Sequence, residues 1–274
     1  MKPLADCLLY TFLDTAYLGG RSPEIVARQL CDGGSDLIQL RAKDRSPGEI
    51  RRMAEKILPV TRAANVGLVI NDHPEIARDL GADGCHLGQE DFFDAGFHRV
   101  SELKIQRAAP AARSATMKVG LSSHGPAQAK LAMAAGANYL AIGPVFATGT
   151  KPGAKPVTVE YVRWAAANVT IPWFAIGGIC LNNLNDVLAA GARSVCVVSA
   201  ILNAPNAAKA CAAFRRLLAS GRKAAAWNRE GGDVRRADGL HSSAAKSRGA
   251  LRAIASGEGK LVPEEGIEPP TKGL

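Results

Sequence analysis

Short apolar runs alternate with helix-forming segments eight times along the first 220 residues of the chain. The runs cover residues 8–13, 36–40, 66–70, 84–87, 118–121, 139–142, 173–176 and 194–198. Two intervening segments begin with Ser-Pro, an N-cap followed by a proline suited to the first helical turn, and several end in glycine. Eight such repeats predict an α/β fold, the closed parallel (β/α)8 TIM barrel. The alternative is an open doubly wound sheet, but no GxGxxG fingerprint follows the first run.

The composition excludes several classes of protein. No apolar run approaches the roughly 18 residues of a membrane span, and the N-terminus lacks the pattern of a secretory signal. The six cysteines form no CxxC pair, which indicates the reducing cytoplasm. The net charge is +9, but the basic residues are dispersed and are not interleaved with aromatic residues, which argues against a nucleic-acid partner.

The end of the chain departs from the repeating pattern. From residue 221 onward the sequence has weak apolar periodicity and frequent glycine, serine and charged residues. We therefore predict a catalytic barrel over residues 1–220 and a tail over residues 221–274 that is disordered and lies outside the catalytic fold.

Polar and charged residues gather at one end of the predicted strands. The second, third and fourth runs are followed by "QLRAKD", "NDH" and "HLGQED", and the fifth by "SSHG". The beginnings of the runs carry few such residues. Because the active sites of TIM barrels lie at the C-terminal ends of the strands, this asymmetry predicts an active-site face there.

Alternation along the second run separates Gln39, Arg41 and Lys43 from Ile38 and Leu40. We expect the apolar pair to face the helices, which leaves the polar side chains pointing inward or to the barrel mouth. A guanidinium buried there needs an acid or an anionic ligand as its partner. The structural alternative is a salt bridge between Arg41 and a barrel carboxylate.

Acidic residues follow the third and fourth runs. Asn71 and Asp72 end the third run and Asp91 follows the fourth, so neighbouring strand ends bring the two carboxylates together. Two carboxylates with water and phosphate oxygens suit Mg²⁺. The alternative for Asp72 is an N-cap of the helix that starts near Pro74. His86 is either a hydrogen-bonded core residue or a site residue, and we favour the site.

The loop "GPVFATGTKPG", residues 143–153, follows the sixth run and contains Thr148, Thr150 and Lys151. Hydroxyls, backbone N–H groups and an ammonium group together suit an anion. The alternative is an ordinary polar surface loop.

Small residues follow the last two runs. Gly177 and Gly178 follow the seventh, and Ser199 follows the eighth. The last two loops of such barrels commonly form a phosphate site, where glycines let backbone N–H groups approach the ligand. The alternative is that the glycines serve only a tight turn.

Five stretches of the chain resemble the thiamine phosphate synthase family, in the family's order. They are "LIQLRAKD", "VINDHPEIARDLGADGCHLGQED", "VGLSSH", "YLAIGPVFATGTKPG" and "AIGGI" with "VVSAI". The resemblance covers residues 9–204 and implies a transferase, thiamine-phosphate diphosphorylase. Such an enzyme joins 4-amino-2-methyl-5-hydroxymethylpyrimidine diphosphate to a thiazole phosphate, and forms thiamine phosphate and pyrophosphate. The implied mechanism is dissociative: the diphosphate leaves, and the thiazole nitrogen captures the pyrimidine cation.

The resemblance also implies a role for each matched residue. The pyrimidine diphosphate would be bound by Gln39, Arg41, Lys43, Asn71, Ser122 and Lys151, and the thiazole phosphate by Thr148, Thr150, Gly178, Val198 and Ser199. Asp72 and Asp91 would hold Mg²⁺. Arg41, Lys43 and Lys151 would act as catalytic residues by stabilising the departing diphosphate. The partners would be two small phosphorylated substrates, and the sequence leaves open whether the chain forms a homo-oligomer.

The chain departs from the family pattern in two places. Residues 92–118 form a longer segment than is usual, and we expect it to hold a helix and a loop near the barrel mouth. Ala147 and Gly149 stand where the family often has prolines.

Two alternative functions remain. A thiazole tautomerase shares the barrel, and His124 matches the position of its catalytic histidine. A non-catalytic sensor of phosphorylated ligands would bind without turnover. The joint presence of the basic residues and the two aspartates favours a diphosphate site and therefore the synthase.

Overall fold

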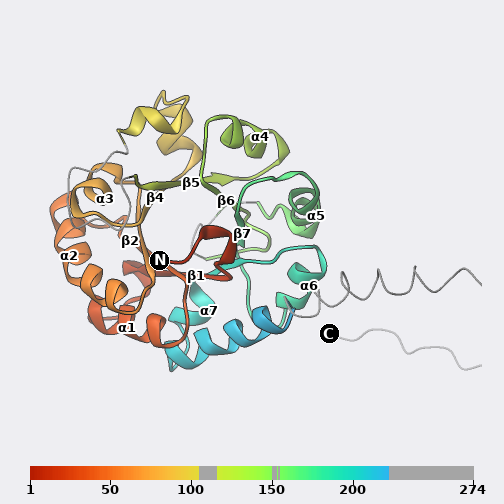
Figure 1. The fold of residues 1–274 in the computed structure, drawn as a ribbon. Coiled ribbons are helices and arrows are strands. Elements are labelled where there is room, and N and C mark those ends of the chain that lie inside the picture. The colour runs from red at the N-terminus through yellow and green to blue at the C-terminus, as the bar shows by residue number, and fades with distance from the viewer. Residues whose placement is uncertain (105–115, 150–152, 154, 222–274) are drawn as a thin grey trace, which may run out of the picture. The chain divides into compact units, whose positions relative to one another are not determined.

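The computed structural model describes residues 1–104, 116–149, 153 and 155–221 of the chain. Within these residues eight parallel strands close into a barrel in chain order, and the last strand pairs with the first (Figure 1). The strands are β1 (Leu9–Asp14), β2 (Leu37–Arg41), β3 (Gly67–Asn71), β4 (Gly84–Leu87), β5 (Lys118–Ser123), β6 (Tyr139–Ile142), β7 (Trp173–Ile176) and β8 (Val195–Val197). The predicted TIM barrel is confirmed, and each predicted strand lies within one or two residues of the observed one.

Helices surround the barrel (Figure 1). They are α1 (Pro23–Asp32), α2 (Pro47–Ala63), α3 (Pro74–Leu80), α4 (Pro126–Ala134), α5 (Thr158–Asn168), α6 (Leu184–Ala189) and α7 (Ser199–Leu202), followed by a helical stretch over residues 207–221. Short helical turns are η1 (Leu4–Asp6), η2 (Thr15–Tyr17), η3 (Glu90–Asp94) and η4 (Val100–Leu103). None of the helices in the described ranges is long and apolar enough to cross a membrane.

The connection between β4 and β5 differs from the expected helix and loop. Its described residues hold only η3, a π-helical turn, and η4, a 3-10 turn, whereas residues 105–115 lie outside the described part of the chain. The described part of this connection therefore contains no full α-helix to cover the barrel.

The two Ser-Pro sequences do place helix N-termini, but they cap them differently. Ser46 forms a capping box with Glu49, in which each side chain accepts a hydrogen bond from the other residue's backbone N–H. Ser22 stands at the N-cap of α1 without a side-chain cap, because its hydroxyl donates instead to the Glu24 carboxylate at 2.6 Å. Both serines are therefore N-cap residues followed by proline, as predicted, but only Ser46 caps its helix with its side chain.

An aromatic layer fills the barrel interior. The rings of Tyr10, Tyr139 and Phe174 pack edge to face, with centroids 5.2 to 6.0 Å apart, and all three are fully buried. Each such pair adds about 0.5–1.5 kcal/mol to the stabilisation from burial. A Cβ atom at Gly120 on β5 would lie 2.0 Å from the Tyr139 ring, so only glycine leaves room for it. All three residues lie in the N-terminal half of their strands, so the layer forms a floor beneath the C-terminal ends of the strands.

The helical stretch over residues 207–221 packs on the barrel beside its first strands. Phe214 and Leu218 are buried, and the Arg215 guanidinium pairs with the buried Asp36 carboxylate at 2.6 Å. All described residues belong to one compact unit, Met1–Glu230; a second unit, Gly231–Leu274, lies outside them. The predicted tail beyond residue 221 likewise lies outside the described residues.

Candidate active site

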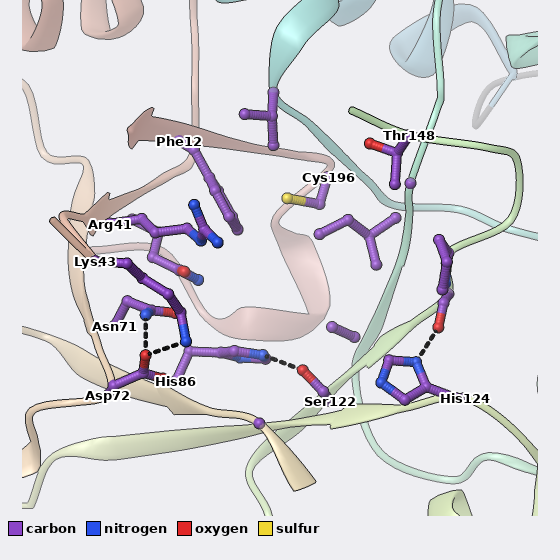
Figure 2. A pocket seen from close by; sticks show the side chains of 18 of the residues that line it. Phe12, Arg41, Lys43, Asn71, Asp72, His86, Ser122, His124, Thr148 and Cys196 are labelled. Carbon is purple, nitrogen blue, oxygen red and sulfur yellow. Dashed lines mark hydrogen bonds and ion pairs between the residues drawn. The ribbon is translucent and has the colours of Figure 1, made fainter. Parts of the chain in front are cut away.

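A cavity of about 350 Å³ opens at the C-terminal ends of the strands (Figure 2). Every strand contributes to its lining, through Phe12, Gln39, Asn71, His86, Ser122, Ala141, Ile176 and Cys196. Its volume is in the range of pockets that bind small molecules. The polar residues that follow the strands therefore meet at one site, as the asymmetry of the sequence predicts.

Arg41 reaches this cavity from the end of β2 and is held by an acid. Its NH1 group donates to the Asp14 carboxylate at 2.7 Å, and Asp14 also accepts the backbone N–H of Ala16 at 3.0 Å. The Asp14 side chain is 1% exposed, and that of Arg41 is 18% exposed. The structural salt bridge is therefore present, and Arg41 lines the cavity as well. A guanidinium has five N–H groups, so the others remain available for an anion.

Lys43, Asn71 and Asp72 form a cluster beside Arg41 (Figure 2). The Lys43 ammonium lies 2.9 Å from Oδ2 of Asp72, and the Asn71 amide donates to the same oxygen at 2.6 Å. Asp72 has a left-handed backbone, with φ of 61°, and precedes the N-cap residue of α3, which is His73. The alternative interpretation of Asp72 as a helix cap is wrong, because the side chain belongs to this cluster in the cavity.

Asp91 lines the same cavity from η3, next to Glu90. Across the described ranges no group of three or more His, Cys, Asp or Glu side chains is arranged to hold a metal ion. Mg²⁺ needs fewer protein ligands, because it keeps water molecules and takes oxygens from substrate phosphates. Asp72 and Asp91 supply the hard oxygen donors that this ion prefers, so the residues present fit Mg²⁺ with substrate as its further ligand.

His86 and Ser122 meet at the bottom of the cavity. The His86 Nε2 atom lies 3.0 Å from the Ser122 hydroxyl oxygen, and the Gln89 side chain donates to the Ser122 carbonyl at 2.5 Å. Burial lowers the pKa of His86 from 6.5 to about 4, so the imidazole is neutral at physiological pH. His86 is buried and hydrogen-bonded, as a core residue would be, and it also lines the cavity, so its role in the site stays a prediction.

Gly177 and Gly178 follow β7 and support the loop after β6. The backbone N–H groups of Val145 and Phe146 donate to the carbonyls of Ile176 and Gly177 at 2.8 and 3.0 Å. Gly178 has a φ of 64°, and a Cβ atom there would lie 2.4 Å from the Ala147 carbonyl oxygen. The glycines thus permit a close approach of two loops, and both residues also line the cavity.

The other predicted residues fall into two groups. Thr148, Val198 and Ser199 also line the cavity, and Figure 2 shows Thr148 on the side away from Arg41. Thr150 and Lys151 lie outside the described residues.

Comparison with known proteins gives the same assignment for most of the chain. The family model for thiamine monophosphate synthase matches residues 9–201. The chain belongs to the thiamine monophosphate synthase family. It is therefore an enzyme of the transferase class, and the resemblance found in the sequence is confirmed.

Individual relatives of this family are similar over most of their own length. The thiamine-phosphate synthase of Thermus thermophilus is 43% identical over 187 residues, which cover 68% of this chain and 84% of that protein. The thiamine-phosphate synthase of Lawsonia intracellularis is 37% identical over 203 residues, 73% of this chain and 88% of that protein. Among solved structures, the thiamine phosphate pyrophosphorylase of Pyrococcus furiosus has a TM-score of 0.67 and 26% identity, over 80% of this chain and 99% of that chain.

Several residues that line or support the cavity were not singled out from the sequence. Phe12 and Cys196 line the cavity, and Asp14 pairs with Arg41. Alternation along "LYTFLD" places Phe12 and Asp14 on the inner face of β1, and this signal was sufficient to find them. His124, which the sequence matched to the tautomerase histidine, lines the cavity too, with its Nδ1 atom 2.5 Å from the Gly143 carbonyl oxygen.

Proposed function

We propose that the enzyme joins 4-amino-2-methyl-5-hydroxymethylpyrimidine diphosphate to a thiazole phosphate, and releases thiamine phosphate and pyrophosphate. One observation carries the proposal: two cations, Arg41 and Lys43, and two carboxylates, Asp72 and Asp91, line a single cavity. This combination suits a diphosphate bound together with a divalent metal ion. Membership of the thiamine monophosphate synthase family supports the same reaction.

The diphosphate end of the first substrate is assigned to the basic side of the cavity. Arg41 would offer the N–H groups that Asp14 leaves free, and Lys43 would add a mobile charge, since its side chain is 53% exposed. Gln39, Asn71 and Ser122 would contact the same substrate by hydrogen bonds. Lys151 is assigned to this group from its place in the sequence.

Asp72 and Asp91 would hold Mg²⁺ in this proposal. The ion would supply positive charge that offsets the charge of the diphosphate. Arg41 and Lys43 act in the same direction, because preorganised cations stabilise negative charge that develops on the leaving group.

The thiazole phosphate is assigned to the part of the cavity lined by residues that follow β6, β7 and β8. These are Thr148, Gly178, Val198 and Ser199, and Thr150 is added from its place in the sequence. Binding both substrates in one cavity holds the thiazole nitrogen near the pyrimidine methylene carbon. Such positioning replaces a collision in solution with a reaction inside one complex.

The reaction in this proposal breaks one bond and forms another. The C–O bond of the pyrimidine methylene group breaks, and its electron pair leaves with the pyrophosphate. The lone pair of the thiazole nitrogen then forms the C–N bond to the cation. That nitrogen carries no proton, so no side chain has to act as a base. Apolar side chains such as Phe12 and Ile176 would limit the water that competes for the cation.

A pyrophosphate-release assay tests the proposal. We expect release that requires both substrates and Mg²⁺ and that falls strongly in Lys151→Ala. The tautomerase alternative has one supporting observation, because His124 lines the cavity. Isomerisation of a thiazole carboxylate phosphate without pyrophosphate release would favour that alternative, and binding of both ligands without any turnover would favour a sensor.

A further inference from the structure

A chain of hydrogen bonds runs beneath the cavity from Gln39 to Ser122. The Gln39 Nε2 group donates to the Tyr10 hydroxyl at 2.6 Å, and the hydroxyls of Tyr10 and Tyr139 lie 3.1 Å apart. The Tyr139 hydroxyl lies 3.3 Å from His86 Nδ1, and His86 Nε2 lies 3.0 Å from the Ser122 hydroxyl. This hydrogen-bond chain crosses the barrel interior, from β2 through β1, β6 and β4 to β5.

One end of this chain is incomplete. The Oε1 atom of Gln39 is buried and has no hydrogen-bond partner among the described residues. Gln39 also lines the cavity. A buried acceptor without a partner is costly, so this atom is placed to accept a hydrogen bond from a ligand.

In this hydrogen-bond chain, the direction of one hydrogen bond determines the direction of the next. Burial raises the pKa of both phenols, so each keeps a single proton and donates once. Since Gln39 donates to Tyr10, the Tyr10 proton must go to Tyr139, and the Tyr139 proton to His86 Nδ1. Neutral His86 then carries its proton on Nε2 and donates it to Ser122. The proton of the Ser122 hydroxyl is left free to donate into the cavity.

The opposite arrangement is also self-consistent, but it presents different groups to the cavity. If the Gln39 amide were turned over, every hydrogen bond of the chain would reverse. The Ser122 hydroxyl would then donate its hydrogen bond to His86 and present only lone pairs to the cavity. Gln39 would present N–H groups to the cavity instead. An anionic phosphate oxygen at Ser122 requires a donor there, so a diphosphate ligand selects the first arrangement.

We propose that Tyr10, Tyr139 and His86 are positioning residues that set the hydrogen-bond polarity of the pyrimidine diphosphate site. They hold Gln39 as an acceptor at one end and Ser122 as a donor at the other. The site then takes a ligand that presents an amino N–H to Gln39 and an anionic oxygen to Ser122. The identity of this ligand and the choice between the two directions rest on the proposed function, whereas the direction itself can be measured without substrate.

The imidazole tautomer of His86 tests the direction without any substrate. Nitrogen-15 NMR of the histidine-labelled, full-length enzyme reports which ring nitrogen carries the proton, and the His86→Gln variant assigns the signal. We expect a neutral ring with the proton on Nε2. A proton on Nδ1 would overturn the proposal. In Tyr139→Phe the donor to Nδ1 is lost, and we expect the Nε2–H form to lose its dominance.

Steady-state kinetics test the link to the substrate. In Tyr139→Phe we expect the KM for the pyrimidine diphosphate to rise about tenfold, with less than about a twofold change in the KM for the thiazole phosphate. Tyr161→Phe is the matched control. The Tyr161 side chain is also buried and its hydroxyl donates to the Gly125 carbonyl at 2.8 Å, but it does not belong to the hydrogen-bond chain described above. Equal effects on both KM values, or equal effects of the two variants, would show that the hydroxyl of Tyr139 serves only stability.

The two experiments separate this inference from the proposed function. Wild-type enzyme that releases no pyrophosphate would overturn the proposed reaction, and the His86 tautomer would still decide the direction of the chain. An active enzyme with the proton on Nδ1 would retain the reaction and overturn the polarity.

Discussion

Asp14 and Arg41 stand opposite each other in the β1–β2 register, and their side chains form an ion pair of 2.7 Å at the edge of the cavity. Asp14 is almost fully buried, whereas Arg41 keeps part of its guanidinium facing the site. Because the acid fixes one N–H group, it orients the others. Asp14 does not line the cavity itself, and in the proposed function it would act on the ligand only through Arg41.

This pairing predicts the effect of Asp14→Asn. The variant keeps the shape of the side chain but removes the charge that holds Arg41, so we expect kcat/KM for the pyrimidine diphosphate to fall about ten- to hundredfold. Asp79→Asn is the control, because Asp79 pairs with Arg51 at 2.9 Å on the surface. Full activity in Asp14→Asn would show that Arg41 needs no partner.

Removal of one carboxylate should change the metal dependence. In Asp91→Asn we expect the Mg²⁺ concentration for half-maximal activity to rise by about tenfold or more, because even outer-shell partners of a metal contribute that much to affinity. Asp94→Asn removes the same charge from the same turn, at an exposed position that does not line the cavity. An identical Mg²⁺ requirement in wild type and Asp91→Asn would contradict the assignment of this carboxylate.

The buried imidazole of His86 predicts how stability depends on pH. The pKa of His86 is about 4 in the folded protein and 6.5 in its ordinary environment. Above pH 6.5 the ring is neutral in both states and contributes no pH dependence. As the pH falls from 6.5 to 4, the unfolded chain binds a proton that the folded protein does not, so the free energy of unfolding decreases by about 1.4 kcal/mol per unit.

Urea unfolding of wild type and His86→Gln at pH 7 and pH 5 measures this contribution. We expect wild type to lose more stability than the variant on this shift, because only wild type contains the buried imidazole. The carboxylates titrate alike in both proteins and cancel in the comparison. Equal losses in the two proteins would contradict the lowered pKa.

Gly178→Ala should destabilise the contact between the loops after β6 and β7. Alanine would be strained at φ of 64° and would lie 2.4 Å from the Ala147 carbonyl oxygen, so we expect a loss of about 3 kcal/mol. Gly136 has a φ of 86° with no atom within 4 Å of the added Cβ, so Gly136→Ala gives the backbone strain alone, about 1 kcal/mol. Thermal unfolding of both variants tests the difference, and equal losses would show that the close approach does not matter.

Removal of the residues after Ser220 tests the predicted limit of the catalytic domain. The truncated chain keeps Phe214, Arg215 and Leu218, which pack the last described helical stretch on the barrel. We expect kcat/KM within about twofold of wild type and a Tm within a few degrees. Loss of folding or of activity would show that the catalytic fold extends into residues 221–274.

The faces of the strands were predictable from the sequence, because a barrel strand has only an inner and an outer side. Alternation therefore placed Gln39, Arg41 and Lys43 together, and all three line the cavity. The contacts between strands were not predictable in the same way. The pair of Asp14 and Arg41 depends on the register between β1 and β2. The alternation of residues within each strand does not determine that register.

The Tyr10–Tyr139 contact shows a second limit. The two residues belong to β1 and β6, which are not neighbours in the barrel, and 129 positions separate them in the chain. They meet because the barrel closes around its interior, where Gly120 leaves space for a ring. The pattern of residues along a single strand gives no information on such a contact. The hydrogen bonds beneath the site can therefore be seen only in the closed barrel.

The most direct test is the stoichiometry of the products. Wild type and Arg41→Ala are incubated with both substrates and Mg²⁺, and thiamine phosphate and pyrophosphate are quantified from the same samples. We predict equal amounts of both products in wild type, formed only when both substrates are present, and a strong loss of both products in Arg41→Ala. Pyrophosphate without thiamine phosphate, or thiamine phosphate at the wild-type rate without Arg41, would contradict a cavity that couples the two substrates through its basic side.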